Sequence, residues 1–290
     1  MRKRFSRILE NGGDEPVDPY QLFLLTGMGE MEFSDLWRFF LLTFIRFAPV
    51  VFLAPFLGSR KGFPMTARAG MILCLTLVFL PTILYHSPTK HITSMMFYAL
   101  TAKELLIGFC LGFLASIPFH IAQSAGIIID YMRGSSMLMT QDPTMEIQTS
   151  PIGVLFNYYL IALFYQLDGP LLFYDAVETS FLILPVAEFS PLHFFQNQTF
   201  WGAIVGLAGK IFEVSIQIAM PAILGVLMAE SFLGIANRLA PQIQIAFLGM
   251  SLKSILGLLL LWAGWYLIIK NMSSFSLDWT NWILQTIQTF

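Results

Sequence analysis

The amino-acid sequence predicts an all-α integral membrane protein. Of its 290 residues, 56% are hydrophobic and only 12% are charged, whereas a soluble domain carries about a quarter charged residues. The mean hydropathy is +0.70, and several apolar runs reach the roughly 20 residues that a helix needs to cross a bilayer. The period-two alternation that marks a membrane β-barrel is not seen.

The N-terminal region, residues 1–35, is expected to be an extension outside the apolar helices. It begins with basic residues, but the stretch that follows, Glu10–Pro19, is acidic and rich in turn-forming residues. This pattern does not match a cleaved signal peptide, whose basic start leads directly into an apolar core. We therefore expect the first apolar helix to begin at Leu36.

Three apolar helices are predicted in the first half of the chain. Their length and composition suit burial in lipid or in protein. Prolines fall near the end of the first run and inside the third, where they are expected to interrupt the helix. The predicted helices are Leu36–Leu57, Ala69–Tyr85 and Leu100–Ile129.

A polar, methionine-rich segment follows near residues 134–151, and no regular structure is expected there. Methionine is unbranched and fills irregular spaces, and irregular backbone at membrane depth is tolerated only where it is buried in protein or lines a wet cavity. A deformable apolar stopper inside a channel meets both conditions; an ordinary surface loop is the alternative. The residues of such a stopper would be Met137, Met139, Asp142, Pro143 and Met145.

Four further apolar runs are predicted in the second half. The first two are separated by the turn Asp168–Pro170, and residues 188–199 form a linker before the last two runs. The tail, Ser273–Phe290, is amphipathic, and its Trp279 and Trp282 suit a membrane–water interface. The predicted helices are Ile152–Gln166, Leu171–Val186, Phe212–Ile235 and Ile243–Ile269.

The turn between the runs Phe212–Ile235 and Ile243–Ile269 is polar, although its flanks are almost entirely apolar. It contains an asparagine, an arginine, a proline and a glutamine within six residues, Asn237, Arg238, Pro241 and Gln242. A polar turn held between two such helices is the tip of a hairpin. It either has a function of its own or must stay in contact with water.

Ionisable residues inside the apolar segments are functional candidates, because each costs roughly 2.5 to 3.5 kcal/mol on insertion scales. They form either a proton or ion relay, or pairs that hold packed helices in register. We favour pairing, since only His120 among the histidines lies within a helix. Arg46, Glu104, Lys210, Glu213 and Glu230 are expected to be buried, and Lys210 and Glu213 can pair on one helical face. The other members are Lys103, Asp130, Arg133, Arg238 and Lys253.

No pattern typical of an enzyme, a metal site or a nucleic-acid-binding protein is present. The sequence contains no HExxH, CxxC or GxSxG motif, and its net charge of -2 provides no basic face for nucleic acid. Cys74 and Cys110 lie inside apolar runs and are expected to act as small buried hydrophobes. We therefore expect no catalytic residue, no metal ligand and no cofactor.

Three segments of the chain together resemble one known family. Phe44–Pro49 resembles an early arginine–proline signature, and Gly126–Gly134, with the polar segment after it, is similar to the family's middle region. Asn237–Gln242, followed by Phe247–Lys253, resembles the most recognisable block. The chain thus resembles the FliR/SctT (YscT, SpaR) family, the T subunits of the type III secretion export apparatus, from about Leu36 to Met272.

This resemblance implies a non-enzymatic subunit of an export gate in the bacterial inner membrane. Such a subunit contacts lipid and assembles with R-type (FliP-like), S-type (FliQ-like) and U-type subunits around a conduit for exported proteins. It implies an R-subunit-like region at 36–199, with a plug in the methionine-rich segment, and an S-subunit-like hairpin and tail at 200–290. The residues expected to contact neighbouring subunits are Asn237, Arg238, Pro241, Gln242 and Lys253.

Two departures and two alternatives accompany the resemblance. Ser251 stands where the family often has proline, and the N-terminal extension has no recognised counterpart. A stand-alone secondary transporter or ion channel is the first alternative function, and a membrane scaffold without a conduit is the second. Copurification with R-type and S-type subunits would separate all three.

Overall fold

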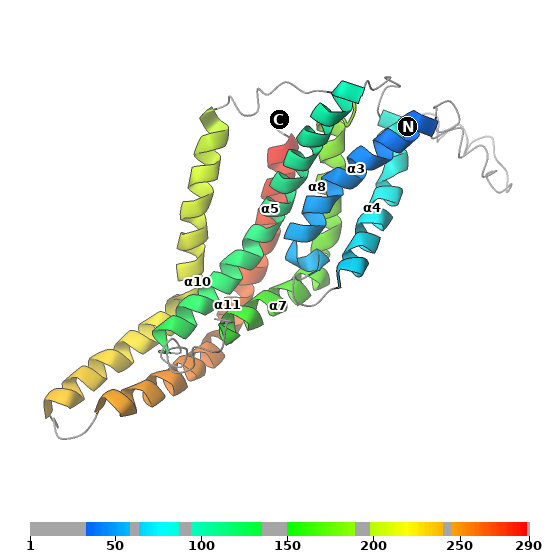
Figure 1. Cartoon of the computed structure of the whole chain (residues 1–290). Helices are drawn as coiled ribbons and strands as arrows, with labels where there is room; N and C mark the ends of the chain where they lie inside the picture. The colour runs from blue at the N-terminus through cyan, green and yellow to red at the C-terminus, as the bar shows by residue number, and fades with distance from the viewer. Residues whose placement is uncertain are drawn as a thin grey trace, which may run out of the picture.

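The computed structural model describes residues 33–58, 64–86, 94–134, 150–188, 198–239 and 245–288, and these residues are all-helical (Figure 1). This confirms the predicted fold class. The elements are α3 (Phe33–Leu53), the 3-10 turn η1 (Pro55–Leu57), α4 (Met65–His86), α5 (Ser94–Met132), α7 (Pro151–Gln166), α8 (Gly169–Ile183), α10 (Gln198–Leu239) and α11 (Ile245–Gln288).

Five described helices are long and apolar enough to cross a membrane, namely α3, α4, α5, α10 and α11. The shorter α7 and α8 pass the same test together, but they meet at a bend of 76°. Asp168 at the bend adopts a left-handed conformation, with φ 55°. A Cβ atom on Gly169 would lie 2.3 Å from the ring of Phe164, so glycine is needed for the helices to meet at this angle.

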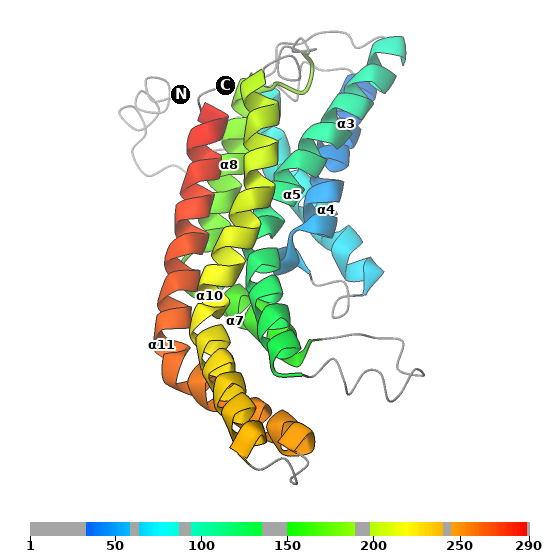
Figure 2. The same ribbon diagram turned by 90° about the vertical axis from the view of Figure 1, so that its left-hand side faces the viewer.

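Helix α5 is the centre of the bundle and contacts α3, α7, α10 and α11 (Figures 1 and 2). Aromatic rings fill the space beside it, because phenylalanine buries a large apolar area. The ring of Phe56 lies 5.8 Å from that of Phe119, 4.9 Å from that of Phe164 and 5.3 Å from that of Phe173. These rings join the turn η1 to α5, α7 and α8.

Close helix packing in the bundle depends on glycine at two places on α5. A Cβ atom on Gly108 would lie 2.2 Å from the backbone oxygen of Arg46 on α3. One on Gly126 would lie 2.4 Å from the Cα atom of Gly153 on α7. Small residues allow such backbone approach in helical membrane proteins, and here they bring α3 and α7 against opposite ends of α5.

Proline interrupts the helices less than the sequence predicted. Helix α3 continues through Pro49 to Leu53 before Pro55 opens η1, and α5 runs unbroken through Pro118. Proline removes a helical N–H and frees the carbonyl four residues earlier. In α5 that carbonyl belongs to Leu114, and the indole N–H of Trp279 on α11 donates to it at 2.9 Å.

The environment of Trp279 differs from the sequence prediction. Its side chain is 5% exposed rather than at an open interface, and its ring stacks on that of Trp282 at 4.9 Å. The tail continues the helix before it, because α11 runs from Ile245 to Gln288 without a break. The C-terminal half of α11 packs against α5 and α8, and this packing buries the indole.

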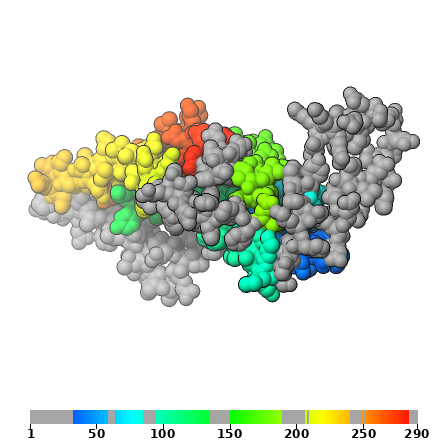
Figure 3. All heavy atoms as spheres, turned by 90° about the horizontal axis from the view of Figure 1, so that it is seen from above, coloured from blue at the N-terminus to red at the C-terminus, as the bar shows by residue number. Residues whose placement is uncertain are grey.

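The antiparallel pair α10–α11 extends beyond the rest of the bundle (Figure 2). In the view from above, the yellow end of α10 lies at one side of the molecule and α3 lies at the other (Figure 3). Within their most apolar windows, 28% of α10 and 17% of α11 is buried, against 56% of α5. The pair therefore exposes a large apolar surface.

Candidate functional site

A buried ion pair between Arg46 on α3 and Glu104 on α5 forms the first polar cluster. Both side chains are fully buried. The Nε and Nη2 groups of Arg46 donate to the two carboxylate oxygens of Glu104, and the Nη2–Oε1 distance is 3.0 Å. Such bidentate pairing is the geometry in which two desolvated charges best compensate each other.

The remaining contacts of Arg46 reach the C-terminal end of α8. Its Nη2 group donates to the carbonyl oxygen of Leu184 at 2.9 Å, and its Nη1 group donates to Ser180 Oγ at 3.4 Å. The guanidinium lies 4.0 Å from the centroid of the Phe181 ring, where a cation is favoured. The pair therefore links α3, α5 and α8.

Lys103 completes this cluster and donates to backbone carbonyls of the turn that follows α8. Its Nζ group donates to the backbone oxygens of Pro185 at 2.7 Å and Glu188 at 2.8 Å, and it lies 3.0 Å from Glu104 Oε1. A cation is favoured at a helix C-terminus, where carbonyl groups are left without partners. Paired in this way, the three charges hold helices together, and the geometry favours a structural role over a relay.

A second polar cluster joins the end of α5 to the start of α7. Asp130 is 3% exposed. One of its carboxylate oxygens accepts hydrogen bonds from Ser150 Oγ at 2.5 Å and from the backbone N–H of Ile152 at 2.9 Å. Ser150 is also the N-cap of α7 and accepts from the N–H of Gly153. Asp130 therefore fixes the chain just before and just after residues 135–149.

Arg133 connects this second cluster to the α10–α11 pair. Its Nη1 atom lies 3.4 Å from Asp130 Oδ1, and its Nη2 group donates to Ser254 Oγ on α11 at 3.3 Å. The stem of Arg133 lies over Gly257, where a Cβ atom would come within 2.6 Å of Arg133 Cγ. The cluster thus ties together α5, α7 and α11.

The predicted stopper and part of the predicted hairpin tip lie outside the described residues. Asn237 and Arg238 are described, and both are exposed in the last turn of α10. Their exposure is consistent with a tip that contacts water or another protein. The predicted site residues outside the described ranges are Met137, Met139, Asp142, Pro143, Met145, Pro241 and Gln242.

The α10–α11 pair corrects the expectation that its charges are buried within the chain. Glu230 and Lys253 form a 2.6 Å ion pair across the two helices, and their side chains are 44% and 27% exposed. Lys210 and Glu213 are both exposed, and no ion pair joins them in the described part of the chain. The physical reason is that α10 packs on few other helices, so its outer face has no cover.

Several residues of the two clusters were not predicted, namely Ser150, Ser180, Ile152 and Ser254. The role of Ser150 could have been predicted, because a serine directly before a proline is typical of a helix N-cap followed by a proline at the first helical position. The other three had none, since an ordinary serine or a backbone N–H becomes a partner only through tertiary contact. Among the described residues, no group of His, Cys, Asp and Glu side chains could hold a metal ion.

This fold and these clusters define a class: a multi-pass helical membrane protein whose buried charges connect its helices. The chain belongs to the family described as bacterial export proteins, family 1, which matches residues 37–278. The match confirms the resemblance to the FliR/SctT family. The chain is therefore a component of a bacterial export apparatus, whose members assemble with one another.

Named relatives agree with this family. The chain is 32% identical to the secretion system apparatus protein SsaT of Salmonella typhimurium, across 75% of this chain and 83% of the relative. It is 30% identical to the Yop proteins translocation protein T of Yersinia pestis, across 74% and 81%. It is 27% identical to the flagellar biosynthetic protein FliR of Bacillus subtilis, across 84% and 93%.

Proposed function

We propose that this protein is a structural and gating subunit of a type III secretion export gate. In this proposal it assembles with R-type and S-type subunits in the bacterial inner membrane, and with a U-type subunit, around a conduit for exported proteins. It performs no chemistry on its cargo. Relatives named for secretion, translocation and flagellar biosynthesis support this function.

The observation that carries the gating role is the Asp130 cluster. It holds the C-terminal end of α5 against Ser150 and Ile152 at the start of α7 and, through Arg133, close to α11. The chain therefore leaves α5 and enters α7 at one fixed place in the protein. This supports the assignment of residues 134–151 as the plug of the closed conduit.

The division into an R-subunit-like region at 36–199 and an S-subunit-like region at 200–290 is also part of the proposal. The α10–α11 pair supports it, because the pair extends beyond the bundle and leaves a long apolar surface without cover. In the proposal this surface packs against neighbouring subunits. Asn237, Arg238 and Lys253 then lie at the tip and on the second arm of a hairpin that faces the entrance.

Copurification tests the proposed function. The chain, tagged at one end, is expressed with R-type and S-type subunits and extracted from bacterial membranes in a mild detergent. We expect the three proteins to elute together as one large particle. Recovery of the chain alone, in a form that transports a solute after reconstitution, would instead support a stand-alone transporter or channel.

A further inference from the structure

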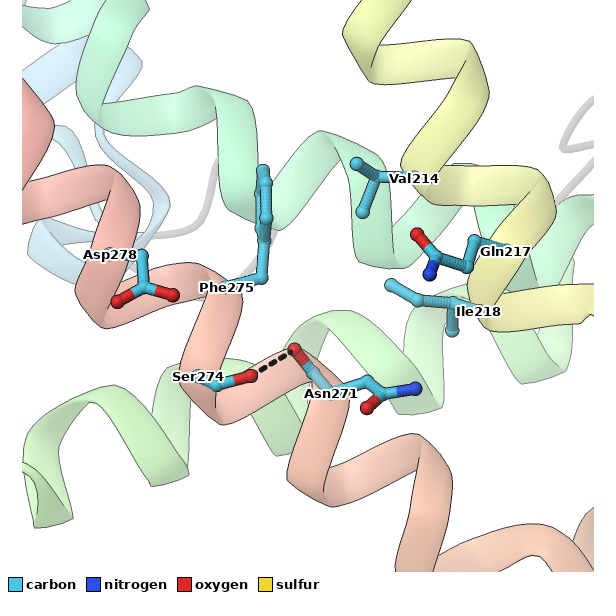
Figure 4. A pocket seen from close by; sticks show the side chains of 7 residues that line it. All are labelled: Val214, Gln217, Ile218, Asn271, Ser274, Phe275 and Asp278. Carbon is cyan, nitrogen blue, oxygen red and sulfur yellow. Dashed lines mark hydrogen bonds between the residues drawn. The ribbon is translucent and has the colours of Figure 1, made fainter.

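A polar pocket lies between the middle of α10 and the C-terminal half of α11 (Figure 4). Val214, Gln217 and Ile218 line it from α10. At 1.5 Å per residue, Gln217 is about 28 Å from the start of α10 and about 33 Å from its end. The residues that line it from α11 are Asn271, Ser274, Phe275 and Asp278.

The polar side chains at the pocket follow helical spacing on both helices. Asn271, Ser274 and Asp278 occupy positions i, i+3 and i+7 of α11, so they share one face. Gln217 has the same relation to Glu213 and Lys210 on α10. All six side chains are exposed. Gln217 lines the pocket with the three residues of α11, and we call the six residues together the 217/278 face.

This polar face lies on two helix segments that are, as a whole, long and apolar enough to cross a membrane. Gln217 falls within the membrane-length segment Gly209–Leu239, and Asp278 falls within the segment Ser251–Ile283. Exposed apolar side chains flank the face on α10, with Phe212 69% exposed and Met220 42% exposed. Charged groups in such segments almost always face protein or water rather than lipid.

Asp278 carries the charge of the pocket, and no basic side chain in the described parts of the chain pairs with it. The hydroxyl of Ser274 donates to the carbonyl oxygen of Asn271 at 3.2 Å, so that donor is already used within α11 (Figure 4). The pocket therefore offers the carboxylate of Asp278 at one side and the amide groups of Asn271 and Gln217 at the other (Figure 4). An ammonium or guanidinium group is its chemical complement.

We propose that the 217/278 face is an interface for a membrane helix of another subunit, and that the helix places a lysine or arginine side chain against Asp278. Gly206 and Gly209 precede this face on α10, and no heavy atom of any other described helix lies within 4 Å of the position that a Cβ atom would take on either glycine. The backbone of a neighbouring helix can therefore come close to α10 there. The inference rests on the proposed function only for the identity of the partner, a subunit of the export apparatus.

Site-specific photocrosslinking tests this interface in the assembled complex. A photoreactive amino acid at Gln217 is expected to form an adduct with a membrane helix that contains lysine or arginine near the attachment point. The same amino acid at Leu77 on α4, which is 59% exposed, is the matched control. Adducts at Gln217 with lipid only, or no adduct at all, would overturn the proposal.

Charge reversal tests the role of Asp278. Asp278→Arg is expected to lower the yield of copurified partner at least tenfold, and an acidic substitution of the crosslinked basic residue is expected to restore it. Asp175→Arg, at an exposed carboxylate on α8, is the control and should leave the yield unchanged. Normal assembly of Asp278→Arg would refute the ionic contact.

Failure of the proposed interface and failure of the proposed function would give different results. If the unmodified chain copurifies with R-type and S-type subunits but Gln217 forms no protein adduct, the interface is wrong and the proposed function stands. If Gln217 crosslinks to a helix of a membrane protein unrelated to export, the face is an interface and the proposed function is wrong.

Discussion

The indole N–H of Trp279 donates a 2.9 Å hydrogen bond to the carbonyl oxygen of Leu114, the carbonyl that Pro118 leaves without a helical partner. A side chain near the C-terminus thereby completes the backbone hydrogen bonding of the central helix. Within a membrane or a large assembly no water is available to satisfy that oxygen. The contact explains how α5 tolerates a proline in its interior.

Replacement of Trp279 by phenylalanine tests this contact. The variant keeps an aromatic ring but leaves a buried carbonyl unsatisfied, which costs about 1–3 kcal/mol. We expect a lower free energy of unfolding, measured by near-ultraviolet circular dichroism in detergent. Trp262→Phe, at a ring that is 79% exposed, is the control and should change stability by less than about 0.5 kcal/mol.

The Arg46–Glu104 pair is expected to behave as a unit. Glu104→Gln leaves a buried guanidinium uncompensated and should cost about 3–5 kcal/mol. The triple variant Arg46→Met, Lys103→Met, Glu104→Leu removes all three charges of the cluster and should recover much of that loss. Protease resistance of the chain in membranes measures the stability of both variants. A triple variant less stable than Glu104→Gln would show that the charges do not depend on each other.

Asp130→Asn is expected to loosen the start of α7. The substitution keeps the shape of the side chain but removes the negative charge beside the first N–H groups of the helix and beside Arg133. Amide hydrogen exchange at Ile152 and Gly153 should become about tenfold faster, which corresponds to about 1.4 kcal/mol. Asp175→Asn on α8 is the control. Equal amide exchange rates in the two variants would contradict the conclusion that Asp130 holds the start of α7 against α5.

Deletion of residues 137–149 tests the plug. We expect the assembled complex, reconstituted in vesicles, to leak small ions, because the deletion removes the methionine-rich segment while Asp130 and Ser150 remain. A glycine–serine segment of equal length in the same place is the control for the loss of chain length. A complex that stays tight after the deletion would rule out the plug assignment.

Arg238→Ala is expected to weaken secretion or assembly with little effect on the stability of the chain. The side chain is exposed in the last turn of α10, where a cation contributes about 0.3–1 kcal/mol to the helix. Secretion of a reporter protein measures the functional loss. Lys270→Ala, at another exposed cation, should secrete normally, and normal secretion by Arg238→Ala would remove its assigned role.

The sequence predicted the existence of the helices well because their apolar runs are long, but α10 begins at Gln198 instead of Phe212 and α11 continues to Gln288 instead of Ile269. It placed Arg46 and Glu104 among the buried charges, but not as partners, because they are 58 residues apart. It also misplaced Trp279, whose burial depends on a carbonyl freed in another helix. Lys210 and Glu213 were expected to be buried because hydropathy does not show which face of a helix is covered.

Fixed ends make residues 135–149 a place where chain length can change. Asp130 and Gly126 hold the end of α5 against the start of α7, so the helices do not depend on the number of residues that joins them. Each doubling of a flexible connection costs only about 0.6 kcal/mol in closure entropy. The contact between the ends of α5 and α7 would therefore persist if the connection between them were lengthened or shortened.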